Sequence, residues 1–257
     1  MSNIFANMKD PDQENTLTKS ILSDKNCLIT GATGGLGREL ARLFVKKNCN
    51  LFLTGTNNSK LSALSDELKT ANKKVKILHH KADLTNTEEI YKLIKEIRKE
   101  FSSIDIVINC AGIFLRSPLS NSSLEEIKNC LNVNVQAPIL LSIEFSQDMV
   151  NKKWGRIVNI GSSSSYQGFK NSSVYCASKH ALLGFSRSVL DELKNDNVRT
   201  FCISPGSIKT KMGETLVDQD YNTFLNPKEI ADTVIFVISF DNEMIIDELR
   251  LNRMKIE

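Results

Sequence analysis

Long apolar runs are the first thing this sequence lacks. The two longest, at residues 139–145 and 234–240, fall well short of the roughly 20 residues that a membrane-spanning helix requires. Residues 1–22 are polar and carry several acids, so they also lack the apolar stretch of a secretory signal. We therefore expect a cytoplasmic protein that does not bind a membrane.

A strong charge bias is missing as well. The 33 basic and 30 acidic residues are spread along the 257-residue chain and leave a net charge of +3. Without a basic stripe there is little to neutralise the phosphates of DNA or RNA, so we expect no nucleic-acid partner. With 41% hydrophobic residues, the composition is that of a globular protein and not of a disordered chain.

Metal-binding patterns are also absent. The six cysteines lie far apart, no CxxC pair occurs, and the three histidines show no ligand spacing. Five of the cysteines lie in or beside apolar runs, which favours a role as small core side chains. We predict neither a metal site nor a disulfide.

Repeats, low-complexity tracts and Pro/Gly-rich linkers are missing too, which favours a single domain. Beyond residue 22, β-rich runs alternate with helix-periodic segments, which predicts an α/β fold: a doubly wound (Rossmann) parallel sheet of about seven strands with helices on both faces. Residues 1–22 are predicted to be a flexible extension, 23–257 the Rossmann-type domain, and 210–226 a mobile flap, since they lack clear periodicity. The expected strands are 26–30, 50–54, 75–79, 104–109, 156–160, 198–204 and 248–251. Thr85 with Glu88, and Ser122 with Glu125, match capping boxes at two helix starts.

A glycine-rich turn joins the first expected strand to the first helix, in the sequence Thr30-Gly31-Ala32-Thr33-Gly34-Gly35-Leu36-Gly37. Missing Cβ atoms let the backbone bend sharply there and approach a pyrophosphate, whose charge is met by free amides and by the positive helix end. A glycine turn alone is a weak signal, because any α/β protein can use one as a tight connection.

The spacing TGxxxGxG resembles that of the short-chain dehydrogenase/reductase family, and later segments carry the resemblance further. Asn109-Cys110-Ala111-Gly112 is similar to the family's Asn-Asn-Ala-Gly element, with Cys110 in place of the second asparagine. Asp83 matches the family residue that bonds the adenine ring, and it also fits a plain helix-entry aspartate. Pro205-Gly206 followed by Thr210 resembles the segment beside the nicotinamide, where the threonine bonds the carboxamide.

The clearest chemical signal is Tyr175-Cys176-Ala177-Ser178-Lys179 at the start of a helix, because tyrosine and lysine four residues apart share one helix face. A free tyrosine has a pKa of about 10, so a nearby ammonium is needed to stabilise its phenolate. Ser162 follows the expected strand 156–160, at the sheet edge where open α/β sheets bind ligands, and its hydroxyl is suited to hold a substrate oxygen. The resemblance gives Tyr175, Lys179 and Ser162 catalytic roles.

Asn134 matches the family's catalytic asparagine, and Pro138 supplies an independent reason to look there. A helical proline has no amide hydrogen for the carbonyl four residues earlier, so we expect a kink that frees the Asn134 carbonyl for a water. In the family, that water links the asparagine to the lysine.

The end of the second strand, Thr54-Gly55-Thr56-Asn57, carries no acid to bind ribose hydroxyls, which favours NADP over NAD. The basic residue common in NADP-binding relatives is missing as well, at Gly34 and Thr56 alike, so Arg38, Lys60 or the Thr56 hydroxyl is left to hold the 2′-phosphate. The predicted cofactor residues are Gly31, Thr33, Gly35, Leu36, Gly37, Thr56, Asp83, Leu84, Asn109, Ala111, Gly112, Tyr175, Lys179, Pro205, Gly206, Ile208 and Thr210.

Together these residues predict an NAD(P)-dependent oxidoreductase that moves hydride between a nicotinamide cofactor and a small alcohol or ketone, with Tyr175 as general acid or base. The alternatives are a 3-oxoacyl-thioester reductase, although Gly34 departs from its usual basic residue, and a non-catalytic nucleotide-binding regulator. The resemblance also implies a homodimer or homotetramer. Ala177, Ala181 and Gly184 are small enough for close helix packing in such an assembly, or for packing on the sheet.

Overall fold

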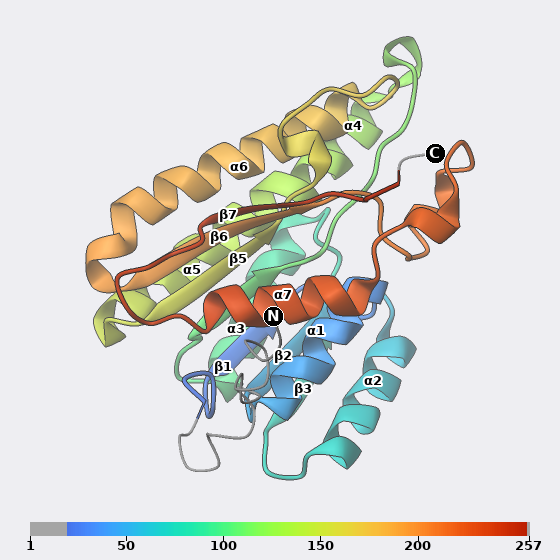
Figure 1. Ribbon diagram of the computed structural model, residues 1–257. Helices are drawn as coiled ribbons and strands as arrows, with labels where there is room; N and C mark the ends of the chain where they lie inside the picture. Colours follow the sequence, from blue (N-terminus) through green and yellow to red (C-terminus); the bar gives the residue numbers. More distant parts are fainter. Residues whose placement is uncertain (1–19, 256–257) are drawn as a thin grey trace, which may run out of the picture.

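The computed structural model describes residues 20–255, which form one parallel sheet covered by helices on both faces (Figure 1). The strand order is β3-β2-β1-β4-β5-β6-β7, which confirms the predicted doubly wound fold of seven parallel strands. The strands are β1 (Asn26–Ile29), β2 (Asn50–Gly55), β3 (Ile77–Lys81), β4 (Ile106–Asn109), β5 (Gly155–Ile160), β6 (Val198–Pro205) and β7 (Glu248–Leu251).

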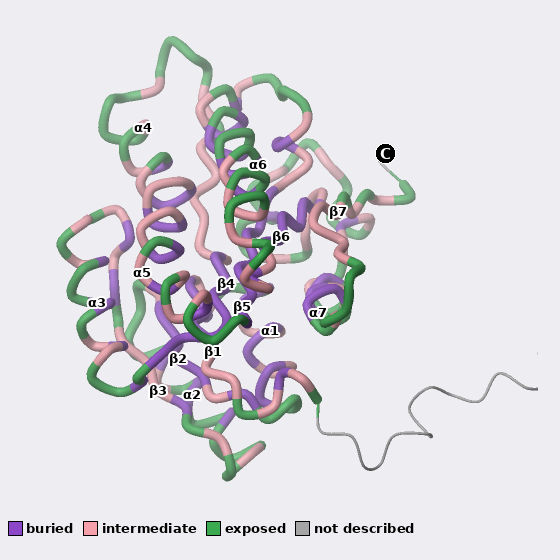
Figure 2. Tube along the Cα trace, turned by 90° about the vertical axis from the view of Figure 1, so that its left-hand side faces the viewer, coloured by how far each residue is buried: buried purple, intermediate pink, exposed green. Residues whose placement is uncertain are grey.

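Seven α-helices connect the strands or cover them. They are α1 (Gly35–Lys46), α2 (Asn58–Ala71), α3 (Thr87–Glu100), α4 (Leu124–Leu131), α5 (Ala137–Lys152), α6 (Ser173–Leu193) and α7 (Pro227–Ile238). Side chains of α1, α2 and α7 fill the core on one face of the sheet, and those of α3 and α5 fill it on the other. Figure 2 shows buried positions following the strands and the inward sides of the helices.

The core explains why these segments adopt their elements. Leu36, Leu40 and Phe44 form the buried stripe of α1, and Ile90, Leu93 and their neighbours form that of α3, as the helical spacing predicts. β4 and β5 are buried along their whole length because helices cover both faces of the central strands. The six cysteines are free, and all except the half-buried Cys110 are buried.

Several boundaries differ from the sequence-based expectation: β1, β2, β5 and β6 each shift by one residue at one end, and β3 and β4 each begin two residues late. β3 begins at Ile77 and not at residue 75, since its ladder with β2 starts where Ile77 pairs with Leu51. Asn86, not Thr85, caps α3 by accepting from the Glu88 amide. The capping box of α4 is formed by Ser123 and Glu126, one residue later than expected.

The predicted N-terminal extension is described only in part. Residues 1–19 of the predicted extension lie outside the described residues, whereas Leu22 is fully buried in the core.

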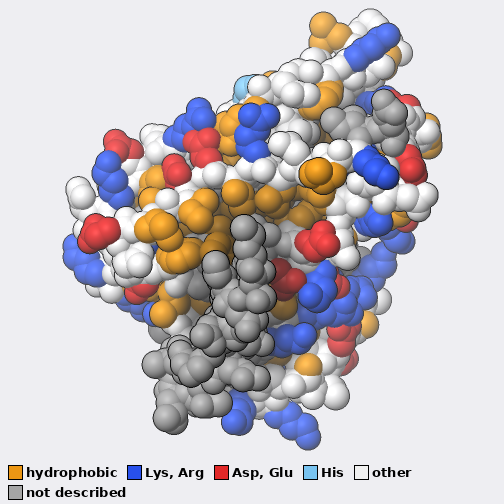
Figure 3. All heavy atoms as spheres, viewed as in Figure 1, with side chains coloured by type: hydrophobic (Ala, Val, Ile, Leu, Met, Phe, Trp, Pro, Cys, Tyr) orange, Lys and Arg blue, Asp and Glu red, His pale blue; other side chains and the backbone are white. Residues whose placement is uncertain are grey.

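The small residues of α6 lie at the surface: Ala177, Ala181 and Gly184 are exposed, so they do not pack on the sheet and stay available for an assembly. Hydrophobic side chains gather over the face that carries α7, where Phe236 is 58% exposed (Figure 3). Within residues 20–255, no helix is both long and apolar enough to cross a bilayer.

Candidate active site

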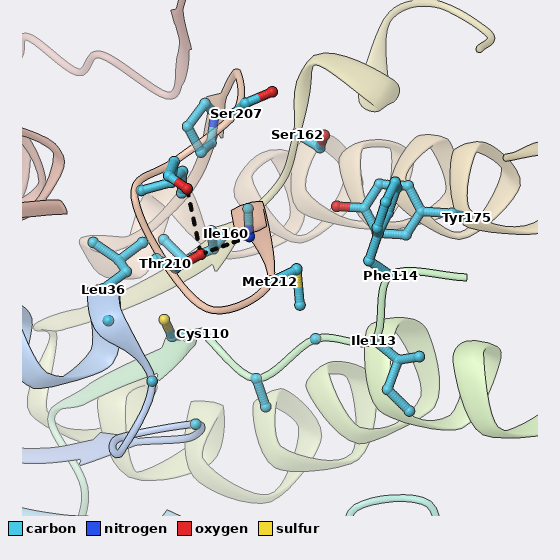
Figure 4. A pocket seen from close by; sticks show the side chains of 18 of the residues that line it. Leu36, Cys110, Ile113, Phe114, Ile160, Ser162, Tyr175, Ser207, Thr210 and Met212 are labelled. Carbon is cyan, nitrogen blue, oxygen red and sulfur yellow. Dashed lines mark hydrogen bonds between the residues drawn. The ribbon is translucent and has the colours of Figure 1, made fainter. Parts of the chain in front are cut away.

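A single cleft of about 1230 Å³ joins the glycine turn to Tyr175. Its walls come from the segments that follow β1, β2, β3, β4, β5 and β6, together with the C-terminal residues 250–253. In Figure 4, Leu36 and Cys110 lie on one side of the cavity, and Tyr175 and Phe114 lie on the other. The structure therefore brings together, at the carboxyl edge of the sheet, segments as far apart in sequence as Gly31 and Arg253, and the strand order predicts a ligand site at this edge.

Glycines of the turn stand where a side chain has no room. Gly31 has a φ of +63°, and a Cβ there would lie 2.8 Å from the Ala111 Cα. A Cβ on Gly37 would lie 2.3 Å from the Gly31 carbonyl oxygen. The turn thus packs tightly on the segment after β4 and opens α1 toward the cleft, as the cradle of a pyrophosphate requires.

Sixteen of the seventeen predicted cofactor residues line this cleft. The exception is Asn109, whose side chain is buried and donates to the Asn159 Oδ1 at 2.8 Å. Asp83 lines the cleft and also accepts from the Thr85 amide (3.0 Å) and hydroxyl (2.8 Å), so it shapes the entry to α3 as well.

The end of the cleft beside β2 carries positive charge. Arg38, Lys60 and Thr56 line it. Neither basic side chain has a carboxylate at ion-pair distance among residues 20–255, because the nearby Glu39 and Glu67 are held by Arg42. This end therefore offers two cations to an anionic ligand group.

Ser162 follows β5 and is fixed by a short helical turn at Ser163–Ser165. Its hydroxyl accepts from the Ser164 amide at 3.1 Å, and its own amide donates to the Ser165 hydroxyl at 3.1 Å. Ser164 and Ser165 are buried, and these two bonds hold Ser162 at the cleft.

Tyr175 and Lys179 lie in the first two turns of α6, and both side chains are buried and line the cleft. The Lys179 Nζ donates to the Ile160 carbonyl at 2.7 Å, at the end of β5, and lies 5.7 Å from the centre of the Tyr175 ring. In Figure 4 the Tyr175 hydroxyl points into the cavity that Ser162 borders. The helix spacing thus places both side chains on the cleft side of α6.

Burial shifts both groups toward their neutral forms. It raises the pKa of Tyr175 to about 12, although the Ser162 hydroxyl acts in the opposite direction. Burial also lowers the pKa of Lys179 to about 8. Desolvation thus outweighs the hydrogen bond with Ser162, and the lowering of the Tyr175 pKa that we expected from Lys179 is not found among the described residues. Tyr175 is a phenol at neutral pH, which suits it to donate a proton.

Asn134 is buried below the cleft and fixes the segment after β4. Its Oδ1 accepts from the Ile113 amide at 2.8 Å, and its Nδ2 donates to the Ile113 carbonyl at 2.9 Å. The expected kink before Pro138 takes the form of a π-helical segment, Asn132–Gln136. A Cβ on Gly112 would lie 3.5 Å from the Asn134 Oδ1 and 3.9 Å from the Lys179 Nζ. Gly112 therefore lies close to the polar atoms of both side chains.

Sequence reasoning missed several residues of the cleft. Phe114 packs edge-to-face on the Tyr175 ring, with centroids 4.9 Å apart. Arg116 reaches across to the flap and binds Asp218 with two hydrogen bonds of 2.8 and 2.7 Å. Arg253 enters from the C-terminal segment. Only the place of Phe114, two residues after the Ala-Gly element, could have drawn attention to it.

Known proteins resemble this chain in sequence. The sequence model of the short chain dehydrogenase family matches residues 25–221. An uncharacterized oxidoreductase of Staphylococcus saprophyticus is 29% identical over 229 residues, which cover 89% of this chain and 97% of that protein.

Solved structures resemble it in fold. A metagenomic short-chain oxidoreductase in complex with NADP is 27% identical, with a TM-score of 0.79, and the match covers 91% of this chain and 99% of that one. A short-chain dehydrogenase from Sphingobium yanoikuyae in complex with NADPH is 25% identical, with a TM-score of 0.78, over 89% and 87% of the two chains.

Proposed function

Because this chain belongs to the short chain dehydrogenase family and is an oxidoreductase, we propose that it reduces a small ketone, or oxidises the matching alcohol, with NADP(H) and with Tyr175 as the proton-transferring group. The observation that carries the proposal is the single cleft that joins the glycine turn to the Tyr175 hydroxyl. A nicotinamide dinucleotide bound there supplies hydride to the carbonyl carbon or accepts it in reverse.

The residues of the chain then do the following work in reduction. Tyr175, protonated at neutral pH, donates its proton to the carbonyl oxygen as the C=O double bond becomes a single bond. The Ser162 hydroxyl holds that oxygen, and Lys179 binds the cofactor ribose and balances the charge left on Tyr175. Asn134 positions the segment after β4 through its side chain. Its backbone carbonyl, which Pro138 is expected to free, would hold a water through which a proton passes from solvent, by way of Lys179, back to Tyr175.

The charge beside β2 supports NADP(H) as the cofactor. Arg38 and Lys60 have no carboxylate partner among the described residues, so both are available to bind the 2′-phosphate of NADP(H). Thr56 occupies the position after β2 where an aspartate or glutamate side chain would repel that phosphate. The relatives solved with NADP and NADPH agree with this choice.

A charge inserted at Thr56 tests the cofactor assignment. Thr56→Asp should weaken NADPH binding at least about tenfold, since juxtaposed like charges cost several kcal/mol. Thr56→Asn, which has the same shape without the charge, serves as the matched control and should stay near the wild type. Fluorescence titration with NADPH and NADH measures both constants, and an equal effect of the two substitutions would contradict the assignment.

NADPH oxidation with a panel of small ketones tests the reaction itself. Turnover with at least one ketone is expected, with NADPH preferred over NADH. If NADPH bound tightly but no ketone or alcohol reacted, the reaction proposed here would be wrong and a nucleotide-binding regulator would be favoured.

A further inference from the structure

Three polar side chains, Ser207, Gln219 and Arg253, meet on the wall of the cleft that follows β6, and we refer to them as the Arg253 cluster. Arg253 donates to the Gln219 Oε1 at 2.8 Å and to the Thr223 hydroxyl at 3.1 Å. Ser207 donates to the same Gln219 oxygen at 3.0 Å. Two donors from distant segments therefore converge on one neutral oxygen.

The Arg253 cluster lies in the same cleft as the proposed reaction centre. Its three members line the same cleft as Tyr175 and Ser162. The Arg253 Cγ would lie 3.8 Å from a Cβ placed on Gly206, the residue that follows β6 at the carboxyl edge of the sheet. Figure 4 shows Ser207 and Ser162 bordering the cavity on the same side. The cluster and Tyr175 thus border one continuous cavity, which a substrate can occupy.

The Arg253 guanidinium has only neutral partners. It packs over the Phe224 ring at 5.1 Å, which fixes its plane, and both of its hydrogen-bond acceptors are uncharged. No carboxylate lies at ion-pair distance from it in the part of the chain that the structure describes. A half-buried guanidinium that keeps spare donors is suited to bind an anion.

The surrounding wall has the same sign of charge. Besides Lys179, the segments after β4, β5 and β6 and the C-terminal residues line the cleft with five bases and one acid: Arg116, Lys170, Lys211, Arg250 and Arg253 against Asp218. Asp218 is already bound by two hydrogen bonds to Arg116. The substrate end of the cleft is therefore cationic, and this favours an anionic ligand.

We propose that Arg253 determines substrate specificity by binding a carboxylate, so that the substrate is a keto acid or the matching hydroxy acid. The inference rests on the reductase activity proposed above. The carboxylate takes the position of the Gln219 oxygen: the planar fork of Arg253 donates to it, and Ser207 supplies a further donor. Because the acceptor it displaces is neutral, no ion pair has to break.

Paired substrates test this inference. Pyruvate, acetoacetate and levulinate are each compared with their methyl esters, which keep the ketone and remove the charge. At least one acid should exceed its ester about tenfold or more in kcat/KM, the effect of charge-assisted hydrogen bonds. Arg253→Gln should reduce that preference about tenfold to a hundredfold, mainly through the KM of the acid.

Two further variants make the result specific. Lys194→Gln removes an exposed cation outside the cleft lining, where it pairs with Asp191, and it should keep the preference for the acid. Arg253→Lys should retain part of it, since the charge remains while the fork is lost. The thermal unfolding midpoint of each variant shows whether it is folded.

Three outcomes contradict the inference. Esters that react as well as their acids in every pair would exclude a carboxylate subsite while leaving the reductase activity intact. An equal loss for acids and esters in Arg253→Gln would show a purely structural role for Arg253. Absence of turnover with every acid and every ester, while another ketone of the panel reacts, would refute the inference alone; absence of turnover with every ketone would refute the reductase activity as well.

Discussion

At the scale of single residues, burial decides what Tyr175 and Lys179 can do. Both side chains are buried in the first turns of α6, and desolvation disfavours the charged form of each. For Tyr175 this keeps the proton that a reduction needs. For Lys179, burial lowers the pKa to about 8, so the lysine loses its charge when the pH rises slightly above the physiological range.

The pKa of Lys179 gives a prediction about cofactor binding. Lysine is cationic below its pKa, which burial lowers to about 8, and neutral above it. Since the ammonium is proposed to bind the cofactor ribose, NADPH affinity should be nearly constant below about pH 7, fall by about half near pH 8, where half of the lysine is neutral, and weaken progressively above that. Fluorescence titration between pH 7 and pH 10 measures this. Lys179→Met should bind weakly and without that pH dependence, and a wild type equally flat to pH 10 would contradict the assignment.

At the scale of elements, the ends of strands carry the site. The glycine turn follows β1, the Ala111-Gly112 segment follows β4, Ser162 follows β5 and Gly206 follows β6. Because all strands are parallel, these four ends meet at one edge of the sheet. Placing a motif directly after a β-rich run was therefore enough to predict where its residues would meet.

The close packing at the glycine turn leads to a prediction about stability. Gly37→Ala should lower the free energy of unfolding by about 1–3 kcal/mol, because its Cβ would overlap the Gly31 carbonyl oxygen. Gly206→Ala is the control: its Cβ would make ordinary contacts of 3.6 and 3.8 Å, so stability should stay the same or rise by up to about 1 kcal/mol. Urea denaturation separates the two cases, and equal effects would mean that the turn tolerates a side chain.

Periodicity and strand-end motifs predicted which elements are present more accurately than they predicted where each element begins and ends. β7 matches its expected range, whereas β3 begins two residues late because the register with β2, and not local composition, sets its start. The N-cap residues of α3 and α4 lie one residue later than predicted, because neighbouring polar residues can each serve as the cap. Such choices depend on tertiary contacts that a sequence pattern does not contain.

The residues that shape the substrate end show the same limit. Phe114, Arg116 and Arg253 belong to segments without any regular pattern, and they reach the cleft only because distant strands end side by side. Tyr175, Lys179 and Ser162 were predictable because their spacing, or their position after a strand, has a chemical reason. Asn109 had such a position too, but its side chain turns away from the cleft and binds Asn159.

At the scale of the whole molecule, a buried arginine ties the sheet to the last helix. Arg156 of β5 is fully buried. It donates to the carbonyl of Ile238, the last residue of α7, and to the Phe240 carbonyl and the Asp241 carboxylate in the segment that follows. It also stacks on the Trp154 ring at 4.4 Å. One side chain thus links the centre of the sheet to the segment that leads to β7, and so to the C-terminal wall of the cleft.

Removal of this arginine should weaken the whole fold. Arg156→Leu leaves the Asp241 carboxylate and several carbonyls without their donor, and it should cost about 3–5 kcal/mol of unfolding free energy. Lys228→Ala, which breaks an exposed ion pair with Asp232, should cost less than about 1 kcal/mol. Chemical denaturation of both variants checks the contrast, and a loss below about 1 kcal/mol for Arg156→Leu would show that the buried network contributes little.

The most direct measurement is the single-turnover rate of NADPH oxidation by Tyr175→Phe, at saturating NADPH and with a ketone that the wild type reduces. The phenylalanine keeps the ring that packs on Phe114 and removes only the hydroxyl, so the rate should fall about 10²–10⁴-fold. Tyr166→Phe, whose hydroxyl binds Glu248 outside the cleft lining, should react like the wild type. A Tyr175→Phe rate close to that of Tyr166→Phe, in a folded protein, would contradict the role of Tyr175 as proton donor.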